Sequence, residues 1–386
     1  MNMREVVIVE AARTPVGKKN GVLSNIRADE LAAKPLKEVI KRAGISAYEI
    51  EDVILGCVSQ TGEQALNIAR IAGLIAGYPK EVPGTTIDRQ CGSSQQAIHF
   101  GCQAILSGDM DVVVAGGIES MSRVPIGSNR QHVTFTSSLT SKYEVIHQGI
   151  SADRIAERWG LSRVELDSFA LNSHQKAVRA QKEGRFDKEI MSVEVTLENG
   201  KTELIKEDEG PRNNTSLEQL AKLKPSFKTN GSVTAGNASQ ISDGANAILL
   251  MSKEKALKLG LKPRFRVLTR SVVGSDPTLM LTGPIPATRK ALQQARLSIT
   301  DIDIFEVNEA FASVALAWLE EMKIDDAKLN PNGGAIALGH PLGASGGRLM
   351  ITMMHELERT GGRYGLQTMC EGYGMANATI IERLDN

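Results

Sequence analysis

Short runs rich in valine and isoleucine alternate along the chain with segments of helical periodicity, and this alternation limits the fold more than any other feature. The apolar runs occupy residues 6–9, 53–55, 112–115, 265–268, 304–307 and 378–381. Helical patterns lie between them at residues 29–43, 96–106, 286–295 and 347–357. Strands that alternate with helices predict an α/β architecture around a largely buried sheet.

Two short motifs recur at a single spacing. Asp52-Val-Ile resembles Asp303-Ile-Phe, and Gly92-Ser-Ser resembles Gly343-Ala-Ser, both at an offset of 251 residues. After each pair of motifs, a helical stretch leads to a strand and to glycines. The common offset indicates that the chain contains two similar halves.

Residues 151–228 interrupt this rhythm. They contain 14 Lys or Arg and 14 Asp or Glu among 78 residues, about 36% charged against 23% for the whole chain. Such a composition is typical of a solvated surface insertion. A run of small residues follows at 231–244 and would suit a loop that contacts a ligand. The predicted order is therefore half, insertion, half.

The charge balance argues against two classes of partner. Lys and Arg together number 45, as do Asp and Glu, so the formal net charge is zero and no overall field draws the chain to nucleic acid or to an anionic membrane. No apolar run approaches 18 residues, and the run at 6–9 is too short for the core of a signal peptide. We therefore expect a cytoplasmic protein without nucleic-acid or membrane partners.

The four cysteines stand at positions 57, 91, 102 and 370. Their separations match neither a zinc site nor a redox dithiol, so we expect no metal and no disulfide framework. Cys57 and Cys102 lie in apolar or helical runs and are interpreted as buried structural thiols. Cys91 follows a short extended run and precedes a helical segment. The helix N-terminus would lower the pKa of its thiol and make it a nucleophile, although a half-buried structural thiol is the alternative.

Three other residues stand in unusual surroundings. His340 lies in a loop with six glycines among residues 333–347, and the repeat places it opposite Cys91. Cys370 follows a strand-like run and enters the turn Cys-Glu-Gly-Tyr-Gly, where we expect it to be more accessible than Cys57. Asn308 follows the run at 304–307 and is a candidate both for a site residue and for a helix N-cap.

Taken together, these motifs resemble those of the thiolases, the family of acetyl-CoA acetyltransferases and 3-ketoacyl-CoA thiolases. The resemblance covers nearly the whole chain and includes Cys-Gly-Ser-Ser at 91–94, Asn-Glu-Ala-Phe at 308–311, Gly-His-Pro-Leu-Gly-Ala-Ser-Gly at 339–346 and Cys-x-Gly-x-Gly at 370–374. It implies two similar halves of a five-layered αβαβα fold with an inserted loop domain. The halves would span residues 1–120, returning at about 229–255, and 256–386, with the insertion at 121–228. It also implies a homodimer or homotetramer.

The resemblance assigns a role to each motif. Cys91 would take the acyl group and His340 would activate it. Cys370 would exchange the proton at the α-carbon of the second substrate, while Asn308 would hold a water that stabilises the enolate with His340. Backbone N–H groups near Cys91 and Gly372 would form the oxyanion hole.

The insertion would bind coenzyme A, which is a substrate, and no other cofactor is implied. By resemblance, the contacts with its nucleotide end, its pantetheine chain and the amides of that chain come from six residues. They are Arg212 at the nucleotide, Leu223, Phe227 and Ala235 along the pantetheine, and Ser239 and His147 at the amides.

The chain departs from the family pattern at several positions. Tyr373 stands where Gly is common, Glu371 replaces an apolar residue, Gln148 replaces the Met of short-chain members, and Gln90 and Gln95 flank the Cys91 motif where leucines are usual. These changes leave the chain-length preference and the direction of the reaction open.

The sequence favours an acetyl-CoA C-acetyltransferase, which interconverts two acetyl-CoA with acetoacetyl-CoA and CoA. The alternatives are a degradative 3-ketoacyl-CoA thiolase for longer or bulkier acyl chains and a non-catalytic acyl-CoA-binding or lipid-binding relative. Loss of Cys91, His340 or Cys370 would mark the last of these, and all three are present. A decarboxylating condensing enzyme would carry His at position 370 and is disfavoured.

Overall fold

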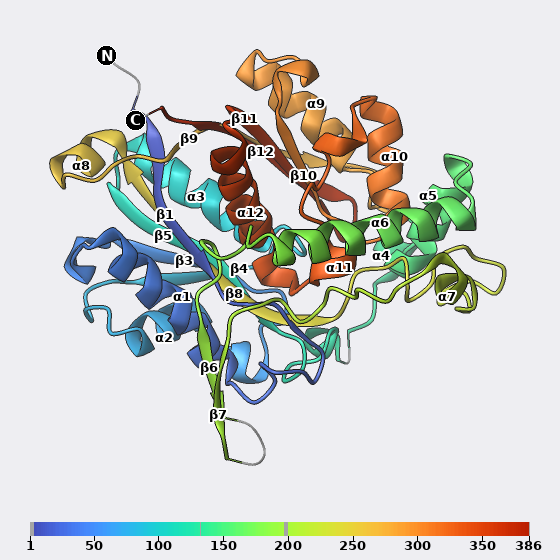
Figure 1. Ribbon diagram of the computed structural model, residues 1–386, viewed down its shortest axis with the longest axis horizontal. Coiled ribbons are helices and arrows are strands. Elements are labelled where there is room, and N and C mark those ends of the chain that lie inside the picture. The colour runs from blue at the N-terminus through green and yellow to red at the C-terminus, as the bar shows by residue number, and fades with distance from the viewer. Residues whose placement is uncertain (1–3, 132, 197–199, 386) are drawn as a thin grey trace.

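A computed structural model describes residues 4–131, 133–196 and 200–385, and its centre is a continuous ten-stranded mixed sheet (Figure 1). The strands follow the order β10-β11-β12-β9-β1-β8-β5-β3-β4, with the short β2 paired beside β8. All six apolar runs noted in the sequence lie in strands, and all four helical patterns lie in helices. The predicted α/β architecture is confirmed.

The two halves of the sheet repeat one topology. In the first, β3 (Asp52–Gly56) runs parallel to β5 (Val112–Ser120), β5 pairs antiparallel with β8 (Ser242–Ser252), and β8 pairs antiparallel with β1 (Val6–Arg13). In the second, β10 (Ile304–Val307), β11 (Tyr364–Glu371), β12 (Met375–Arg383) and β9 (Phe265–Gly274) have the same order and the same senses. The duplication expected from the sequence is therefore present in the fold.

The halves meet where β1 and β9 pair antiparallel through Val7 with Arg266 and Ile8 with Phe265. At the opposite edges lie β10 and β4 (Gly84–Ile87), while β2 (Gly17–Lys18) pairs with the start of β8. Strand β8 is buried along its whole length, and its first residues belong to the small-residue run that the sequence assigned to a ligand loop.

Helices cover the strands in layers. The helices of the first half are α1 (Ala28–Ala43), α2 (Ile68–Ile75), α3 (Ser93–Ser107) and α8 (Lys253–Lys258), and those of the second are α9 (Pro284–Ala295), α10 (Ala312–Met322), α11 (Ala335–Leu338) and α12 (Ser345–Thr360). Helices α1 and α9 pack on the outer faces, whereas α3 and α12 contact each other and lie between the strands of the two halves (Figure 1). This arrangement is the αβαβα layering that the family resemblance implied.

Glycines allow α3 and α12 to pack closely. A Cβ at Gly346 would lie 2.6 Å from the Gln95 backbone nitrogen of α3, and one at Gly343, just before α12, would lie 2.6 Å from the Ile118 carbonyl oxygen of β5. Both distances are far shorter than real contacts. The sequence suggested that the glycines of the 333–347 segment let a ligand approach the backbone. In the structure they serve the close packing of helices and strands at least as much.

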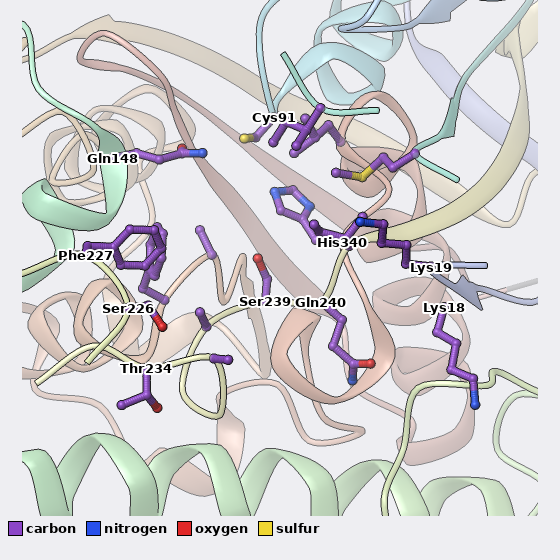
Figure 2. Close-up of a pocket in the computed structure, with 18 of the residues that line it drawn as sticks. Lys18, Lys19, Cys91, Gln148, Ser226, Phe227, Thr234, Ser239, Gln240 and His340 are labelled. Atoms are coloured by element: carbon purple, nitrogen blue, oxygen red, sulfur yellow. The ribbon is translucent and has the colours of Figure 1, made fainter. Parts of the chain in front are cut away.

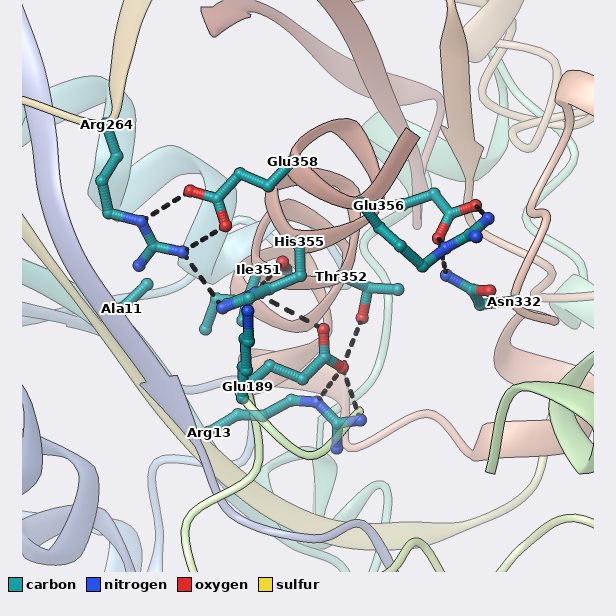
Figure 3. A network of polar contacts seen from close by, with 12 residues as sticks. Ala11, Arg13, Glu189, Arg264, Asn332, Ile351, Thr352, His355, Glu356 and Glu358 are labelled. Carbon is teal, nitrogen blue, oxygen red and sulfur yellow. Dashed lines mark hydrogen bonds and ion pairs between the residues drawn. The ribbon is translucent and has the colours of Figure 1, made fainter. Parts of the chain in front are cut away.

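The insertion contains α4 (Ser137–Thr140), α5 (Gln148–Arg158), α6 (Arg163–Lys182), α7 (Leu217–Ala221) and the ribbon of β6 (Val193–Thr196) and β7 (Thr202–Ile205). Its anchor is Arg13 at the end of β1, which is 1% exposed (Figure 3). The Arg13 guanidinium lies 2.7 Å from carboxylate oxygens of both Glu189 and Asp208. Thr352 of α12 also donates to Glu189 at 3.0 Å. One buried charge network thus joins the insertion to both halves.

The exact domain boundaries that the sequence suggested stay a prediction. Within the described residues, none of the helices has the length and apolar character needed to cross a bilayer.

Candidate active site

Cys91 lies at a strained turn between β4 and α3. Gln90 has a positive φ of 47°, and Ser93 closes the turn by donating to the Gln90 carbonyl at 2.6 Å and accepting the Arg89 N–H at 2.9 Å. Strained backbone of this kind is concentrated at functional sites. The turn holds the Cys91 side chain, which is 7% exposed, at the base of a cavity.

The protonation state of Cys91 differs from the sequence expectation. Burial raises the pKa of the Cys91 thiol well above its ordinary value, and the nearby Cys370 and Glu371 raise it further. The expected lowering by the helix N-terminus was wrong because the penalty for a buried anion outweighs the dipole of α3. Cys91 is therefore a neutral thiol at rest and needs a base to become a nucleophile.

His340 can act as that base. It lines the same cavity as Cys91, follows Gly339 with its φ of 103°, and donates its backbone N–H to the Gln240 carbonyl at 3.0 Å. Ser345 contacts the ring Nδ1 at 2.5 Å and sets the orientation of the imidazole. Burial, with a smaller effect from Arg348, lowers the pKa of His340 to about 3. The ring is neutral at physiological pH and can accept a proton.

Asn308 links His340 to the second thiol. Its Nδ2 lies 3.4 Å from His340 Nε2, and its side chain also hydrogen-bonds Cys370. Among the described residues its Oδ1 has no partner, so it remains available to a water or to a substrate. Helix α10 begins at Ala312 with Phe311 as its N-cap, so the capping alternative for Asn308 is wrong.

Cys370 is fully buried, as is Cys57, so the expectation that it is more accessible than Cys57 was wrong. The turn that follows it is closed by Tyr373, with a φ of 64°, and by Gly374, which packs on the backbone of residues 275 and 276. Burial, followed by the charge of Glu371, raises the pKa of the Cys370 thiol to about 12. A neutral thiol of this kind can donate a proton to a strongly basic carbanion.

Two cavities open from Cys91 in different directions. The first has a volume of about 610 Å³ and the second about 400 Å³. Five residues line both of them, namely Cys91, Ile126, His147, Gln148 and Leu342. Figure 2 shows Cys91 and His340 together at one end of the first cavity. A substrate whose reacting carbon lies at the Cys91 sulfur can therefore extend into both cavities.

The first cavity contains most of the residues that the resemblance assigned to coenzyme A. Those that line it are His147, Arg212, Phe227, Ala235 and Ser239. Leu223 does not line it but lies against Gly236, next to Ala235. Gln240, which lies in the run 231–244 expected to contact a ligand, lines it as well. The sequence reasoning missed Lys18 and Lys19 in the same cavity, although adjacent lysines are a recognisable sign of an anion site. The three cationic side chains that line this cavity, Lys18, Lys19 and Arg212, favour a ligand that carries phosphates.

An aromatic stack forms one wall of this first cavity. His147 stacks on Phe227 with ring centroids 5.0 Å apart, and Phe227 meets Phe311 edge to face at 5.9 Å. His147 is also the N-cap of α5 and accepts the Gly149 N–H at 3.1 Å. A Cβ at Gly149 would lie 2.2 Å from the Phe227 ring, so only glycine lets this ring lie flat against α5.

The second cavity is lined by residues that the sequence reasoning did not assign. Ser59 follows β3, and Asn129, Arg130 and Phe135 come from the loop after β5; they line the cavity together with Gln90 and the turn residues Gly372 and Tyr373. Tyr373 and Phe135 meet edge to face with centroids 6.0 Å apart. Two positions at which the chain departs from the family pattern, Gln90 and Tyr373, therefore face this cavity. Gly372 lies in its wall beside Gln90, and its role in an oxyanion hole stays a prediction.

Glu371 is an unexpected carboxyl group directly behind Cys91. It is fully buried, and neither of its oxygens has a hydrogen-bond partner in the described part of the chain. Its Oε1 lies so close to Gly92 that a Cβ there would be 2.1 Å away. A second buried carboxyl, Glu119 near the end of β5, accepts hydrogen bonds from Val58, Ser59, Gln64 and Gly343. The registers of β3 with β5 and of β10 with β11 match Glu119 to Cys370 and Ser120 to Glu371, so Glu371 has no carboxyl counterpart in the first half.

Burial raises the pKa of Glu371 to about 8, with Asp88 raising it and Arg89 opposing the shift. Glu371 is therefore mostly neutral below pH 8 and becomes an anion above it. In Glu371→Gln this charge never forms, so Cys91 should ionise more readily, and iodoacetamide should label it several-fold faster at pH 9 but at the wild-type rate at pH 6.

The matched control is Glu371→Asp, which keeps the charge and should keep the wild-type pH dependence. Because the folded-state pKa lies above that of an exposed carboxyl, the stabilising contribution of Glu371 is lost as pH rises through about 8. The melting temperature of Glu371→Gln relative to wild type should therefore be higher at pH 9 than at pH 6. Equal labelling rates at pH 9 would contradict this description of the carboxyl.

The described residues contain no group of three or more His, Cys, Asp or Glu side chains that could hold a metal ion. The predicted lack of a metal or an additional cofactor stays a prediction.

Comparison with known proteins gives a consistent result. A family model described as thiolase, N-terminal domain, matches residues 6–254, and one described as thiolase, C-terminal domain, matches residues 261–383. A steroid 3-ketoacyl-CoA thiolase of Mycobacterium tuberculosis is 52% identical, covering 99% of this chain and 95% of the relative. A beta-ketoadipyl-CoA thiolase of Pseudomonas aeruginosa is 45% identical over 99% and 100%. The crystal structure of the Bacillus anthracis acetyl-CoA acetyltransferase superposes with a TM-score of 0.91, at 41% identity and 99% coverage of both chains.

Proposed function

The chain belongs to the thiolase family of acyltransferases, and from that premise we propose that it cleaves 3-ketoacyl-CoA thioesters with acyl chains longer than acetoacetyl. The observation that supports this proposal is the second cavity, which continues beyond Cys91 for about 400 Å³. At about 30 Å³ per water molecule, this is room for roughly a dozen groups of that size, far more than an acetyl methyl needs. Two of the similar proteins named above also carry substrates longer than acetoacetyl-CoA in their names.

The first half of the proposed reaction forms an acyl-enzyme. Neutral His340 takes the proton of the Cys91 thiol, and the thiolate attacks the C3 carbonyl carbon of the substrate. When the C2–C3 bond breaks, the acyl group stays on Cys91 as a thioester. The electron pair passes to the enolate of acetyl-CoA, which takes a proton from the Cys370 thiol. The Cys370 thiolate then regains a proton from the His340 imidazolium. Asn308, placed between His340 and Cys370, would stabilise this enolate through its amide and a bound water.

The second half releases the acyl group and restores the Cys91 thiol. After acetyl-CoA leaves, the thiol of free CoA gives its proton to His340 and attacks the acyl carbon. The Cys91 sulfur leaves and regains its proton from the His340 imidazolium. The three groups therefore have the same protonation state before and after the cycle. This agrees with Cys91, Cys370 and His340 all being neutral at rest.

A second candidate is the acetyl-CoA C-acetyltransferase that the sequence favoured. Its support is the similarity to the Bacillus anthracis protein of that name, and the same residues would perform the condensation of two acetyl-CoA. This assignment stays a prediction, as do the cytoplasmic location and the assembly into a homodimer or homotetramer.

A chain-length series separates the two candidates. Wild-type protein is assayed for thiolysis of 3-ketoacyl-CoA thioesters from four to ten carbons, with acetyl-CoA condensation measured in parallel. Each buried methylene contributes about 0.8 kcal/mol, so kcat/KM should rise several-fold per two-carbon step until the second cavity is filled. Activity confined to acetoacetyl-CoA would favour the acetyltransferase instead. No turnover of any thioester, with CoA still bound, would favour a non-catalytic relative.

A further inference from the structure

We propose that the second cavity recognises a carboxylate at the far end of the acyl chain through Arg130, so that the favoured substrates are 3-ketoacyl-CoA thioesters of dicarboxylic acids. This inference rests on the proposed function, because it assumes that the second cavity holds the acyl chain. It goes further by naming the chemical class of that chain.

Arg130 is a cation without a counter-ion. It ends the short 3-10 helix Ser128–Arg130 and lines the second cavity. Its guanidinium lies 5.9 Å from the centroid of the Phe135 ring, and among the described residues no carboxylate pairs with it. By contrast, Arg123 in the same loop pairs with Glu63 at 2.5 Å. An arginine that is stacked on a ring and left unpaired is prepared to bind an anion from outside the chain.

The cavity around Arg130 offers no competing anion. In the part of its wall that the structure describes, Arg130 is the sole Lys or Arg, and neither Asp nor Glu is present. The phosphates of coenzyme A do not need this residue, because Lys18, Lys19 and Arg212 line the other cavity. The positive charge at Arg130 is therefore available to the acyl chain of a substrate in the second cavity.

A buried hydroxyl in the same cavity supports a polar acyl chain. Ser59 is 1% exposed and lines the second cavity, yet its Oγ has no hydrogen-bond partner within the described residues. A plain hydrocarbon chain would leave this hydroxyl buried and unsatisfied, which is unfavourable. A chain that carries oxygen atoms would satisfy it. Ser59 inside the cavity and Arg130 at its exposed end therefore favour the same class of chain.

The geometry also explains the departure at Tyr373. Its ring meets Phe135 edge to face, and Phe135 in turn lies under the Arg130 guanidinium. Glycine at position 373 would remove one member of this series of contacts. Tyr373 therefore connects the turn after Cys370 to the loop that positions the guanidinium over the cavity.

The test compares two six-carbon thioesters that differ only at the far end, 3-oxoadipyl-CoA with a carboxylate and 3-oxohexanoyl-CoA with a methyl group. The variants are Arg130→Gln and Arg130→Lys. The matched control is Arg158→Gln, since Arg158 is also exposed and stacked on a ring, that of Trp159 at 5.2 Å, but does not line this cavity. Thiolysis is measured as kcat/KM at low and at high salt.

We expect the wild type to favour 3-oxoadipyl-CoA, and Arg130→Gln to lose about tenfold in kcat/KM on that thioester while changing less than about twofold on 3-oxohexanoyl-CoA. Arg130→Lys should retain part of the preference, Arg158→Gln should retain all of it, and salt should weaken it. If the wild type cleaves both thioesters equally well, or if Arg130→Gln slows both equally, the role of Arg130 is wrong and the proposed function stands. If the wild type cleaves neither, the proposed function fails and this inference fails with it.

Discussion

Replacing Cys91 with serine should abolish both halves of the reaction and lower thiolysis by four or more orders of magnitude, on the order of what loss of the nucleophile costs in other acyl-transfer enzymes. Serine keeps the size of the side chain but offers a hydroxyl that His340, whose pKa is lowered to about 3, cannot activate. The Cys91 side chain packs among Val58, Met121 and Leu342, and serine fits the same space. The fold should therefore be kept.

The measurement is the amount of radiolabelled acetyl retained on protein after incubation with acetyl-CoA, together with the rate of thiolysis. Cys102→Ser is the matched control, because Cys102 is a buried thiol on α3, the helix that follows Cys91, and lines neither cavity. It should retain wild-type labelling. Retention of label by a folded Cys91→Ser at the wild-type level would show that another residue carries the acyl group.

The site residues that could be predicted from sequence share one property. Cys91, Asn308 and Cys370 each stand within a few residues of the end of a strand, where a local pattern of apolar residues and turn residues is visible in the chain. Helices α3 and α12, which begin shortly after Cys91 and His340, contact each other, so the repeat brings its two motifs together. The local pattern and the duplication together were enough to locate the centre of the site.

Features that depend on contacts between distant segments could not be predicted in the same way. The pKa of Cys91 depends on burial beneath Leu342 and on the charge of Glu371, neither of which is near it in the chain. The walls of the second cavity come from an irregular loop without periodicity, and Arg130 and Phe135 gave no signal there. Strand β8 was missed because its first residues are small and polar, yet it is buried through its pairing with β1 and β5.

The duplication also shows how one half became specialised. Strands β5 and β11 are equivalent, and their registers match Glu119 to Cys370. Glu119 accepts several hydrogen bonds, one of them from the Gly343 N–H of the other half. Gly92, the motif counterpart of Gly343, gives its N–H to Arg89 instead. That hydrogen bond belongs to the strained turn that presents Cys91. The position that holds a hydrogen-bonded carboxyl in the first half thus holds the second thiol of the site, Cys370, in the other half.

Cys370→Ser should separate the two halves of the reaction. The variant should still transfer acetyl from acetyl-CoA to Cys91 at close to the wild-type level, because that step needs Cys91 and His340. It should lose roughly 10²–10⁴-fold in thiolysis and in condensation, since a serine hydroxyl is a far poorer acid and base than the Cys370 thiol.

Cys57→Ser is the matched control, because Cys57 is equally buried but its thiol does not line either cavity. Radiolabel trapping and the condensation assay are run on the same preparations of each variant. The diagnostic result is normal trapping with crippled condensation in Cys370→Ser, opposite to the loss of both in Cys91→Ser. If a folded Cys370→Ser traps no acetyl, Cys370 also acts in the transfer of acyl between CoA and Cys91. The separate roles proposed for the two thiols, which follow from Cys370 and not Cys91 sharing a hydrogen bond with Asn308, would then be wrong.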